Sequence, residues 1–184
     1  MTGLNRDTDT IMSICCFVTD YDLNVLDDKG FETVIHHNKN DLDRMGDWCK
    51  DTHGRTGLTD ACLASTTTAE AAATNLLKYV QRYVPERRRG LLAGNSVHCD
   101  KEFLRRQPFD KALDYLSYRI MDVSTVKEMA KRWAPEGILK HAPPKKGLHQ
   151  AREDILESIA EAAYYRKVFF LGKEDVGKKE KEKA

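Results

Sequence analysis

Residues 91–106 constrain the fold most, because they join an apolar run, a glycine turn and a helix. Leu91–Ala93 predicts a short buried strand, Gly94–Ser96 supplies turn and N-cap residues, and Lys101–Arg106 has the amphipathic pattern of a helix. Asp100 then lies in the first helical turn, beside the edge of a sheet. The helix dipole favours a carboxylate there, and open α/β sheets bind ligands at that edge. An ordinary capped helix is the alternative interpretation.

A second stretch with polar side chains at a predicted helix start lies further along the chain. His149 stands just before a predicted helix that runs to about Phe170, and Asp154 lies about one turn inside it. Both side chains could therefore face one pocket. Together with Asp100 they make two carboxylates and a histidine at helix starts, a set that can bind divalent cations and activate water.

The first eighty residues predict strands followed by helices. Apolar and β-branched runs separated by turn residues predict an antiparallel meander of three strands. These strands are Ile11–Thr19, Val25–Leu26 and Phe31–His36. A helical segment follows at residues 41–50. Thr67 and Glu70 then have the spacing of a capping box for a helix that ends at Val84, before a proline.

The second half of the chain alternates helices with a strand. The predicted elements are a helix at Asp110–Leu116, a strand at Tyr118–Val123, a helix from Ser124 or Thr125 to Trp133, and a loop at 135–147. This order predicts an α/β fold with a mixed central sheet flanked by helices. A length of 184 residues suits one domain, expected at residues 1–172. Residues 173–184 are charged and expected to be a disordered tail.

The balance of charge limits the partners of this chain. The formal net charge is +1, and the tail from 173 to 184 accounts for it, with five lysines against four acidic residues. A long nucleic acid held by its phosphates needs a basic surface, which this composition does not supply. Any nucleic-acid partner should therefore be short, or held by specific contacts. Arg87–Gly90 is a short basic loop that is either solvated or a phosphate contact.

Cysteine spacing and hydropathy predict an intracellular protein that does not enter a membrane. The five cysteines have no paired C-x-x-C spacing, which argues against zinc-ribbon and redox motifs and for reduced thiols. No apolar run approaches the ~20 residues of a membrane span, and no secretory signal follows Met1.

Trp48 and His53 fall together at the end of a predicted helix. One interpretation is a core tryptophan beside a surface histidine. The other is a platform and a donor for a nucleotide, since any base can stack on tryptophan.

Four blocks in this order resemble the oligoribonucleases of the DEDDh exonuclease family, whose fold is similar to ribonuclease H. The blocks are MTGL at 1–4, GNSVHCD at 94–100, SYRIMDVSTVKEMAKRW at 117–133 and HQAREDILESIAEAAYYR at 149–166. Each block is modest, but their shared order is specific and covers nearly the whole chain. Families that share only the H-x-x-x-x-D element lack the third block.

The resemblance implies a 3'-to-5' exoribonuclease that degrades very short RNA, down to dinucleotides, with two Mg²⁺ or Mn²⁺ ions. Asp100 and Asp154 correspond to metal ligands, and His149 corresponds to the general base that deprotonates the attacking water. A histidine with a pKa near 6.5 suits that step at neutral pH, and paired cations stabilise the attacking and leaving oxygens.

The resemblance also implies how short substrates are selected. Leu4 corresponds to a wedge between two bases and Trp48 to a stacking platform. His53 and Ser96 correspond to part of a cap on the 5' phosphate. Tyr118 of the partner subunit would complete that cap, which implies a homodimer and excludes longer strands. The expected location is the cytoplasm or the mitochondrion.

One motif of the family is not in this sequence. The family has Asp-x-Glu on the first strand immediately before MTGL, and this sequence starts at that Met. Two of four metal carboxylates and most of the first strand are therefore missing. Ser13 also replaces a usual glutamate, and Asp7 and Asp9 correspond to loop positions. Either the chain is a fragment of an ordinary enzyme, or it is a short form with a weakened metal site and an open sheet edge.

Three functions follow from these alternatives. The first is the metal-dependent oligoribonuclease. The second is a catalytically silent protein that binds nucleotides without hydrolysing them. The third is a related exonuclease that trims DNA or longer RNA ends. Hydrolysis of dinucleotides compared with twenty-residue strands would separate the first from the third.

Overall fold

The computed structural model describes residues 1–144 and 150–171, so the predictions for His149 and for the tail at 173–184 lie outside the described residues. The described strands form two pairs. β1 (Ser13–Cys16) runs antiparallel to β2 (Phe31–Val34), and β3 (Leu92–Gly94) runs parallel to β4 (Ile120–Asp122). The α/β class is confirmed, and among these residues the sheet consists of two separate two-stranded parts.

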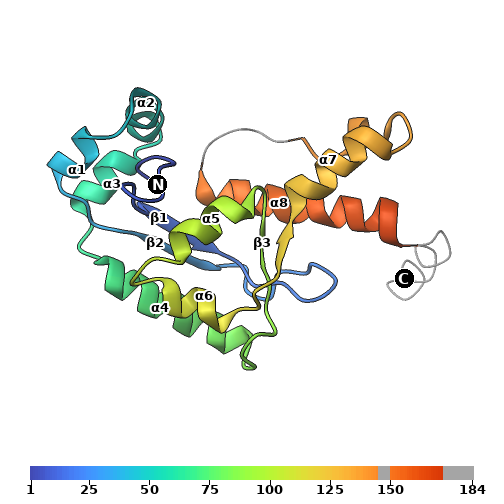
Figure 1. The fold of residues 1–184 in the computed structure, drawn as a ribbon, viewed down its shortest axis with the longest axis horizontal. Helices are drawn as coiled ribbons and strands as arrows, with labels where there is room; N and C mark the ends of the chain where they lie inside the picture. The colour runs from blue at the N-terminus through green and yellow to red at the C-terminus, as the bar shows by residue number, and fades with distance from the viewer. Residues whose placement is uncertain (145–149, 172–184) are drawn as a thin grey trace.

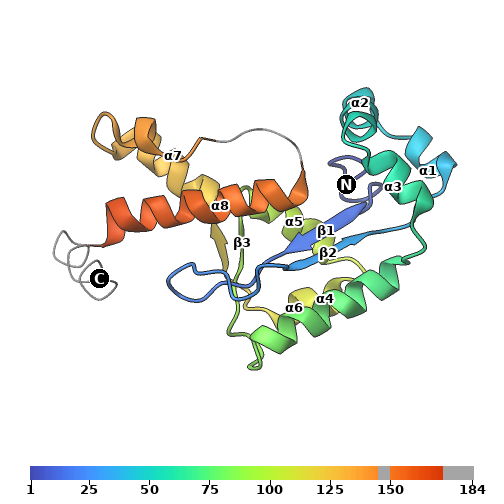
Figure 2. The same ribbon diagram turned by 180° about the vertical axis from the view of Figure 1, so that it is seen from behind.

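Two long helices enclose the first strand pair. α8 (Ala151–Tyr165) packs on β1, and α4 (Ala69–Tyr83) packs on β2. Figures 1 and 2 show β1 and β2 lying between these two helices. α8 also contacts β3, so it is an element that both sheets share. The chain continues past α8 in a π-helical turn, Arg166–Phe170.

The prediction of a strand at Val25–Leu26, the second of the expected three, is wrong. Val25 makes only an isolated bridge to Thr19. The Asp20 carboxylate accepts hydrogen bonds from the backbone N–H groups of Asp22 at 2.8 Å and Asn24 at 2.9 Å. The turn thus closes on one side chain, and the residue pairing after it is limited to this single bridge.

The single helix predicted at 41–50 is two helices. α1 (Lys39–Asp43) ends before Gly46, whose backbone is extended, and α2 (Asp47–Arg55) starts after it. α3 (Leu58–Ala64), which the sequence did not predict, packs against α2. This break lets the three helices surround one buried cluster. The cluster consists of Met12, Leu42, Met45 and Cys62.

The predicted capping box of α4 is displaced by one residue. Thr68 is the N-cap, and its hydroxyl accepts from the Ala71 N–H at 3.2 Å. Thr67 is held elsewhere, because its carbonyl accepts from the His36 N–H and its own N–H donates to Ser65 Oγ. The buried face of α4 has the predicted helical spacing. It consists of Ala72, Ala73, Leu76 and Val80.

The remaining elements follow the predicted order. They are α5 (Val97–Leu104), α6 (Asp110–Tyr115), α7 (Val123–Trp133) and a 3₁₀ turn at Ile138–His141 inside the expected loop. Asp122 caps α7 in place of Ser124 or Thr125, because β4 runs directly into the helix. α7 packs on α8 around another buried cluster, which consists of Val123, Ala130, Ala162 and Tyr165. None of the helices in the described ranges is long and apolar enough to cross a bilayer.

Candidate active site

The ends of β3 and β4 place polar groups at one sheet edge, as the sequence predicted for Ser96. Gly94 and Asp122 are paired in the parallel register. The Ser96 N–H, just past Gly94, donates to Asp122 Oδ1 at 2.9 Å and to Ser124 Oγ at 3.0 Å. The turn before α5 is therefore anchored by the first residues of α7.

Ser96 occupies the N-cap position of α5 without using its side chain as a cap. Its φ is +52°, in the left-handed region, and its hydroxyl makes no capping bond. The hydroxyl lies 3.3 Å from Ser124 Oγ instead. The predicted N-cap position is confirmed, but the expected capping hydrogen bond from the side chain is not formed. The exposed hydroxyl remains available at the surface of the turn.

Asp100 lies in the first turn of α5, as predicted. Part of its surface is open to solvent, but the atoms around its carboxyl group restrict hydration, and this desolvation raises the pKa of Asp100. The backbone N–H of the helix start and the Met1 amine act in the opposite direction and lower that pKa. A bound cation would compete with the Met1 amine for the same carboxylate.

Met1 connects Asp100 to the Trp48 and His53 pair. Its amine interacts electrostatically with Asp100, and burial lowers the pKa of this amine. Its carbonyl accepts a hydrogen bond from His53 Nε2 at 3.0 Å. Met1 therefore lies between α2 and α5, a role that the sequence did not predict. Backbone groups carry no signature in a sequence, so this contact could not be inferred.

The aromatic pair has the exposure that a stacking surface needs. The rings of Trp48 and His53 are 6.5 Å apart between centroids and nearly perpendicular, at 76°. Trp48 is 64% exposed and Leu4 is 81% exposed. Desolvation lowers the pKa of His53, which favours the neutral ring. Trp48 is thus a surface side chain, and the interpretation of it as a core residue is wrong.

Tyr118 has an exposed side chain beside α5. It is 70% exposed, and the Arg119 guanidinium lies 4.5 Å from its ring centroid. Lys101 Nζ donates to the Tyr118 carbonyl at 2.7 Å, which fixes the backbone beside α5. An exposed aromatic ring at this position is compatible with a contact to another molecule.

Asp154 lies in the first turn of α8, as predicted, and its backbone N–H donates to the Gln150 carbonyl at 3.0 Å. No group of three or more His, Cys, Asp or Glu side chains in residues 1–144 and 150–171 could hold a metal ion. Magnesium is usually bound by one or two carboxylates together with water and substrate phosphates. Because no such group of three is present among them, the described residues do not form a complete metal site by themselves.

Asp9 is already occupied by the loop that contains it. Its carboxylate accepts from Thr2 Oγ1 at 2.9 Å and from the Asn5 N–H at 2.8 Å. A Cβ atom on Gly3 would lie 2.3 Å from this carboxylate, so a side chain there would displace Asp9. These contacts agree with the expectation that Asp9 is a loop residue.

A buried polar network behind the sheet edge was not predicted. Glu161 is 2% exposed and accepts from Lys127 Nζ at 3.2 Å and from the Tyr165 hydroxyl at 3.0 Å. The Asn95 amide donates to Ser158 Oγ at 2.7 Å and to Glu161 at 3.4 Å. The available signal was a glutamate three residues after Ser158 and four before Tyr165, on the buried face of the predicted helix.

Comparison with known proteins finds that this chain is similar to one group of nucleases. The model of the RNase T family, described as an exonuclease, matches residues 1–162. The chain is 44% identical over 181 residues to the mitochondrial oligoribonuclease of Mus musculus, covering 97% of this chain and 74% of that protein. It is 44% identical over 169 residues to the oligoribonuclease of Chromobacterium violaceum, covering 92% and 91%.

A third relative is considerably longer than this chain. The probable oligoribonuclease of Schizosaccharomyces pombe is 43% identical over 166 residues, which are 90% of this chain. The match spans 64% of the length of that protein.

Proposed function

We propose a nuclease function for this chain from the premise that it belongs to the RNase T exonuclease family. The ribonuclease H-like fold predicted from the sequence is the fold of that family. Relatives from a mouse, a yeast and a bacterium are named oligoribonuclease. The proposed activity is 3'-to-5' hydrolysis of short oligoribonucleotides and dinucleotides to mononucleotides.

The observation that carries this proposal is the group formed by Trp48, His53 and Asp100 around Met1. The exposed indole offers a flat surface for a base, and the carboxylate lies at a helix start nearby. Stacking on an aromatic ring accepts any base, which suits an enzyme that degrades RNA of any sequence. A net charge of only +1 favours a short substrate over a long one.

Divalent cations are the cofactors of this family in general. We propose Mg²⁺ or Mn²⁺ here, with Asp100 and Asp154 as the ligands that this chain supplies. His149, which lies outside the described residues, is the proposed base that takes the proton of the attacking water. The described residues do not complete the metal site, so the remaining ligands must come from other groups.

The proposed site also measures the length of the substrate. Leu4 would separate two bases, while His53 and Ser96 would contact the 5' phosphate together with Tyr118 of the partner subunit. This arrangement requires a homodimer. The exposure of Leu4 and Tyr118 supports the proposal, because neither side chain is buried in the core. The cytoplasm and the mitochondrion are the proposed locations.

The test is hydrolysis of a 5'-phosphorylated diribonucleotide with Mn²⁺. It compares this chain with a form extended upstream through the coding sequence of its source, because the relatives are longer. We expect activity in the extended form. There, His149→Ala should lower kcat by about 10²–10⁴, the usual contribution of a general base. His141→Ala is the matched control.

A second candidate function is nucleotide binding without hydrolysis. The exposed Trp48 indole supports it, because an aromatic ring can bind a base by stacking without any metal ligand. Its signature is dinucleotide binding that depends on Trp48, with no hydrolysis by either form. Hydrolysis of twenty-residue strands as fast as dinucleotides would contradict the proposed preference for short RNA.

A further inference from the structure

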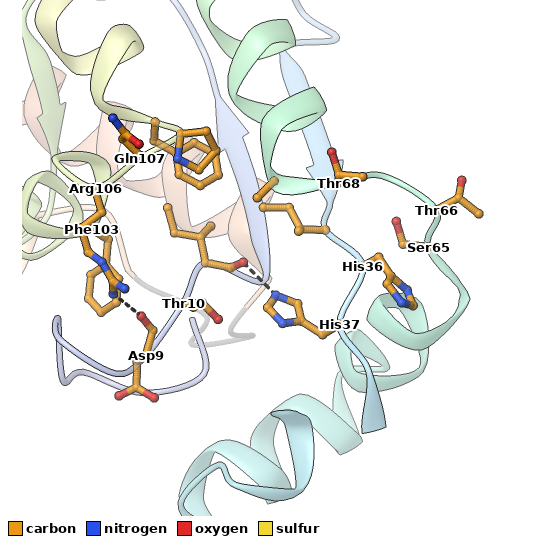
Figure 3. Close-up of a pocket in the computed structure, with 15 residues that line it drawn as sticks. Asp9, Thr10, His36, His37, Ser65, Thr66, Thr68, Phe103, Arg106 and Gln107 are labelled. Atoms are coloured by element: carbon orange, nitrogen blue, oxygen red, sulfur yellow. Dashed lines mark hydrogen bonds between the residues drawn. The ribbon is translucent and has the colours of Figure 1, made fainter. Parts of the chain in front are cut away.

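A cavity of about 530 Å³ lies between the N-terminal loop, the segment after β2, the start of α4 and the end of α5. This volume falls within the range of about 300–1,000 Å³ found for small-molecule sites. Figure 3 shows the side chains around it. None of the residues proposed above for hydrolysis or RNA binding lines this cavity.

Much of the cavity lining is apolar. Ile35, Phe103 and Phe109 line the cavity and are at most 5% exposed. Ile11, Ala69 and Pro108 complete this part of the lining. Buried aliphatic and aromatic side chains of this kind pack well against a flat ring.

Two polar side chains, Arg106 and His37, border the apolar part of the lining, and Arg106 has free hydrogen-bond donors. Arg106 Nη1 donates to the carbonyls of Arg6 at 2.6 Å and Asp9 at 2.8 Å. The other nitrogens of this guanidinium make no hydrogen bond within the described part of the chain. His37 Nε2 donates to the Ile11 carbonyl at 3.0 Å, and its second ring nitrogen makes no bond to the residues that the structure describes. Figure 3 shows Arg106 and His37 reaching the cavity from opposite sides.

The carboxylate in the lining does not oppose these donors. Asp9 is the acidic residue among the lining residues, and both of its carboxylate oxygens accept hydrogen bonds from Thr2 and Asn5. In Figure 3 its carboxylate points away from Arg106 and the cavity. The cavity therefore offers the free guanidinium nitrogens of Arg106 to an anion, with no free carboxylate to repel it.

We infer that this cavity binds a small organic anion that carries a flat apolar ring. The ring would lie on Phe103, Phe109 and Ile35, and the anionic group would bind the free guanidinium nitrogens of Arg106. A nucleoside monophosphate and an aromatic carboxylate share this chemistry. The site is separate from the proposed hydrolysis and does not depend on it.

The test is isothermal titration calorimetry of the whole chain in EDTA with four probes. Adenosine 5'-monophosphate and indole-3-acetate carry both a ring and an anionic group, whereas adenosine lacks the charge and inorganic phosphate lacks the ring. We expect saturable binding of at least one of the first two probes. The probe that binds identifies the source of the anion. Adenosine and phosphate should each bind about tenfold more weakly or worse.

Two variants locate the binding. Arg106→Gln removes the charged donor. Ala69→Leu fills the cavity from the start of α4 and leaves the arginine in place. Each variant should weaken binding about tenfold. Arg105→Gln is the matched control, because its neighbouring guanidinium does not line the cavity. Trp48→Ala removes the stacking surface proposed for RNA, so any adenosine 5'-monophosphate binding that it abolishes is assigned to that surface and not to the cavity. No binding of either ring-bearing anion, or binding that both cavity variants leave intact, would overturn the inference.

Discussion

Glu161 is a residue whose effect on stability follows directly from its surroundings. Its carboxyl group is buried beside Lys127 and Tyr165. Breaking a buried ion pair by removing one partner costs about 3–5 kcal/mol. Because Lys127 is 38% exposed, its charge regains water, and we expect Glu161→Ala to lower the unfolding free energy by about 2–3 kcal/mol.

Urea unfolding monitored by circular dichroism would measure this loss. Glu136→Ala, at an exposed position, is the control and should change the free energy by less than about 0.5 kcal/mol. Equal effects of the two substitutions would contradict the importance of the buried network.

Asp100 gives a prediction that depends on pH. Desolvation raises its pKa above the ordinary 3.8, so the folded chain holds this proton more tightly than the unfolded chain. Ionisation therefore costs the folded state stability as pH rises through and above that value. In EDTA, Asp100→Asn should be more stable than the parent at pH 7, and this advantage should disappear as pH falls below about 4.

The measurement is the unfolding free energy of both proteins at several pH values. Asp51→Asn, in the exposed part of α2, controls for the loss of one charge. An advantage of Asp100→Asn that is constant over this pH range would argue against the role of desolvation.

The position of Asp100 was predictable, while the network of Glu161 was not. Asp100 follows a local pattern of strand, glycine turn and helix start, which lies within ten residues of sequence. Glu161 meets Lys127 and Asn95 only after folding, and such long-range contacts leave no local signal. His149 remains a prediction, because it lies outside the described residues.

Among the elements, the start of α4 allows a direct test of helix capping. The Thr68 hydroxyl accepts from the Ala71 N–H. Replacing a threonine N-cap with alanine usually costs about 1 kcal/mol. We expect that loss for Thr68→Ala in urea unfolding and a much smaller one for Thr66→Ala, two positions earlier. A larger effect at Thr66 would mean that the helix begins elsewhere.

Element order could be predicted from the sequence better than element boundaries. The strands at β1, β2, β3 and β4 and the helices α4 to α8 lie where apolar periodicity indicated them. The errors arose where one residue controls the backbone. Gly46 divides the predicted helix at 41–50, and Asp20 closes a turn that leaves Val25 in an isolated bridge. Short helices such as α3 have too few turns to show a clear period.

For the whole molecule, the proposed homodimer predicts that RNA with a 5' phosphate is distinguished from RNA with a 5' hydroxyl group. We expect the chain to sediment as a dimer. In EDTA, Tyr118→Ala should bind a 5'-phosphorylated dinucleotide about tenfold more weakly and leave the binding of its 5'-hydroxyl analogue unchanged. Tyr21→Ala, which removes a ring that is more exposed than that of Tyr118, is the control. A monomer at high concentration, or equal losses for both dinucleotides, would reject the shared cap.

The contacts of α8 have a consequence for synthesis on the ribosome. α8 packs on β1, and its Arg152 guanidinium lies 4.9 Å from the Phe17 ring centroid and donates to the carbonyls of Asp28 and Lys29. Translation at about 5–20 residues per second separates the synthesis of Phe17 and Arg152 by on the order of 10 s. During that interval β1 lacks the helix that covers it. A nascent chain of this protein should therefore bind chaperones that recognise apolar segments until α8 leaves the exit tunnel.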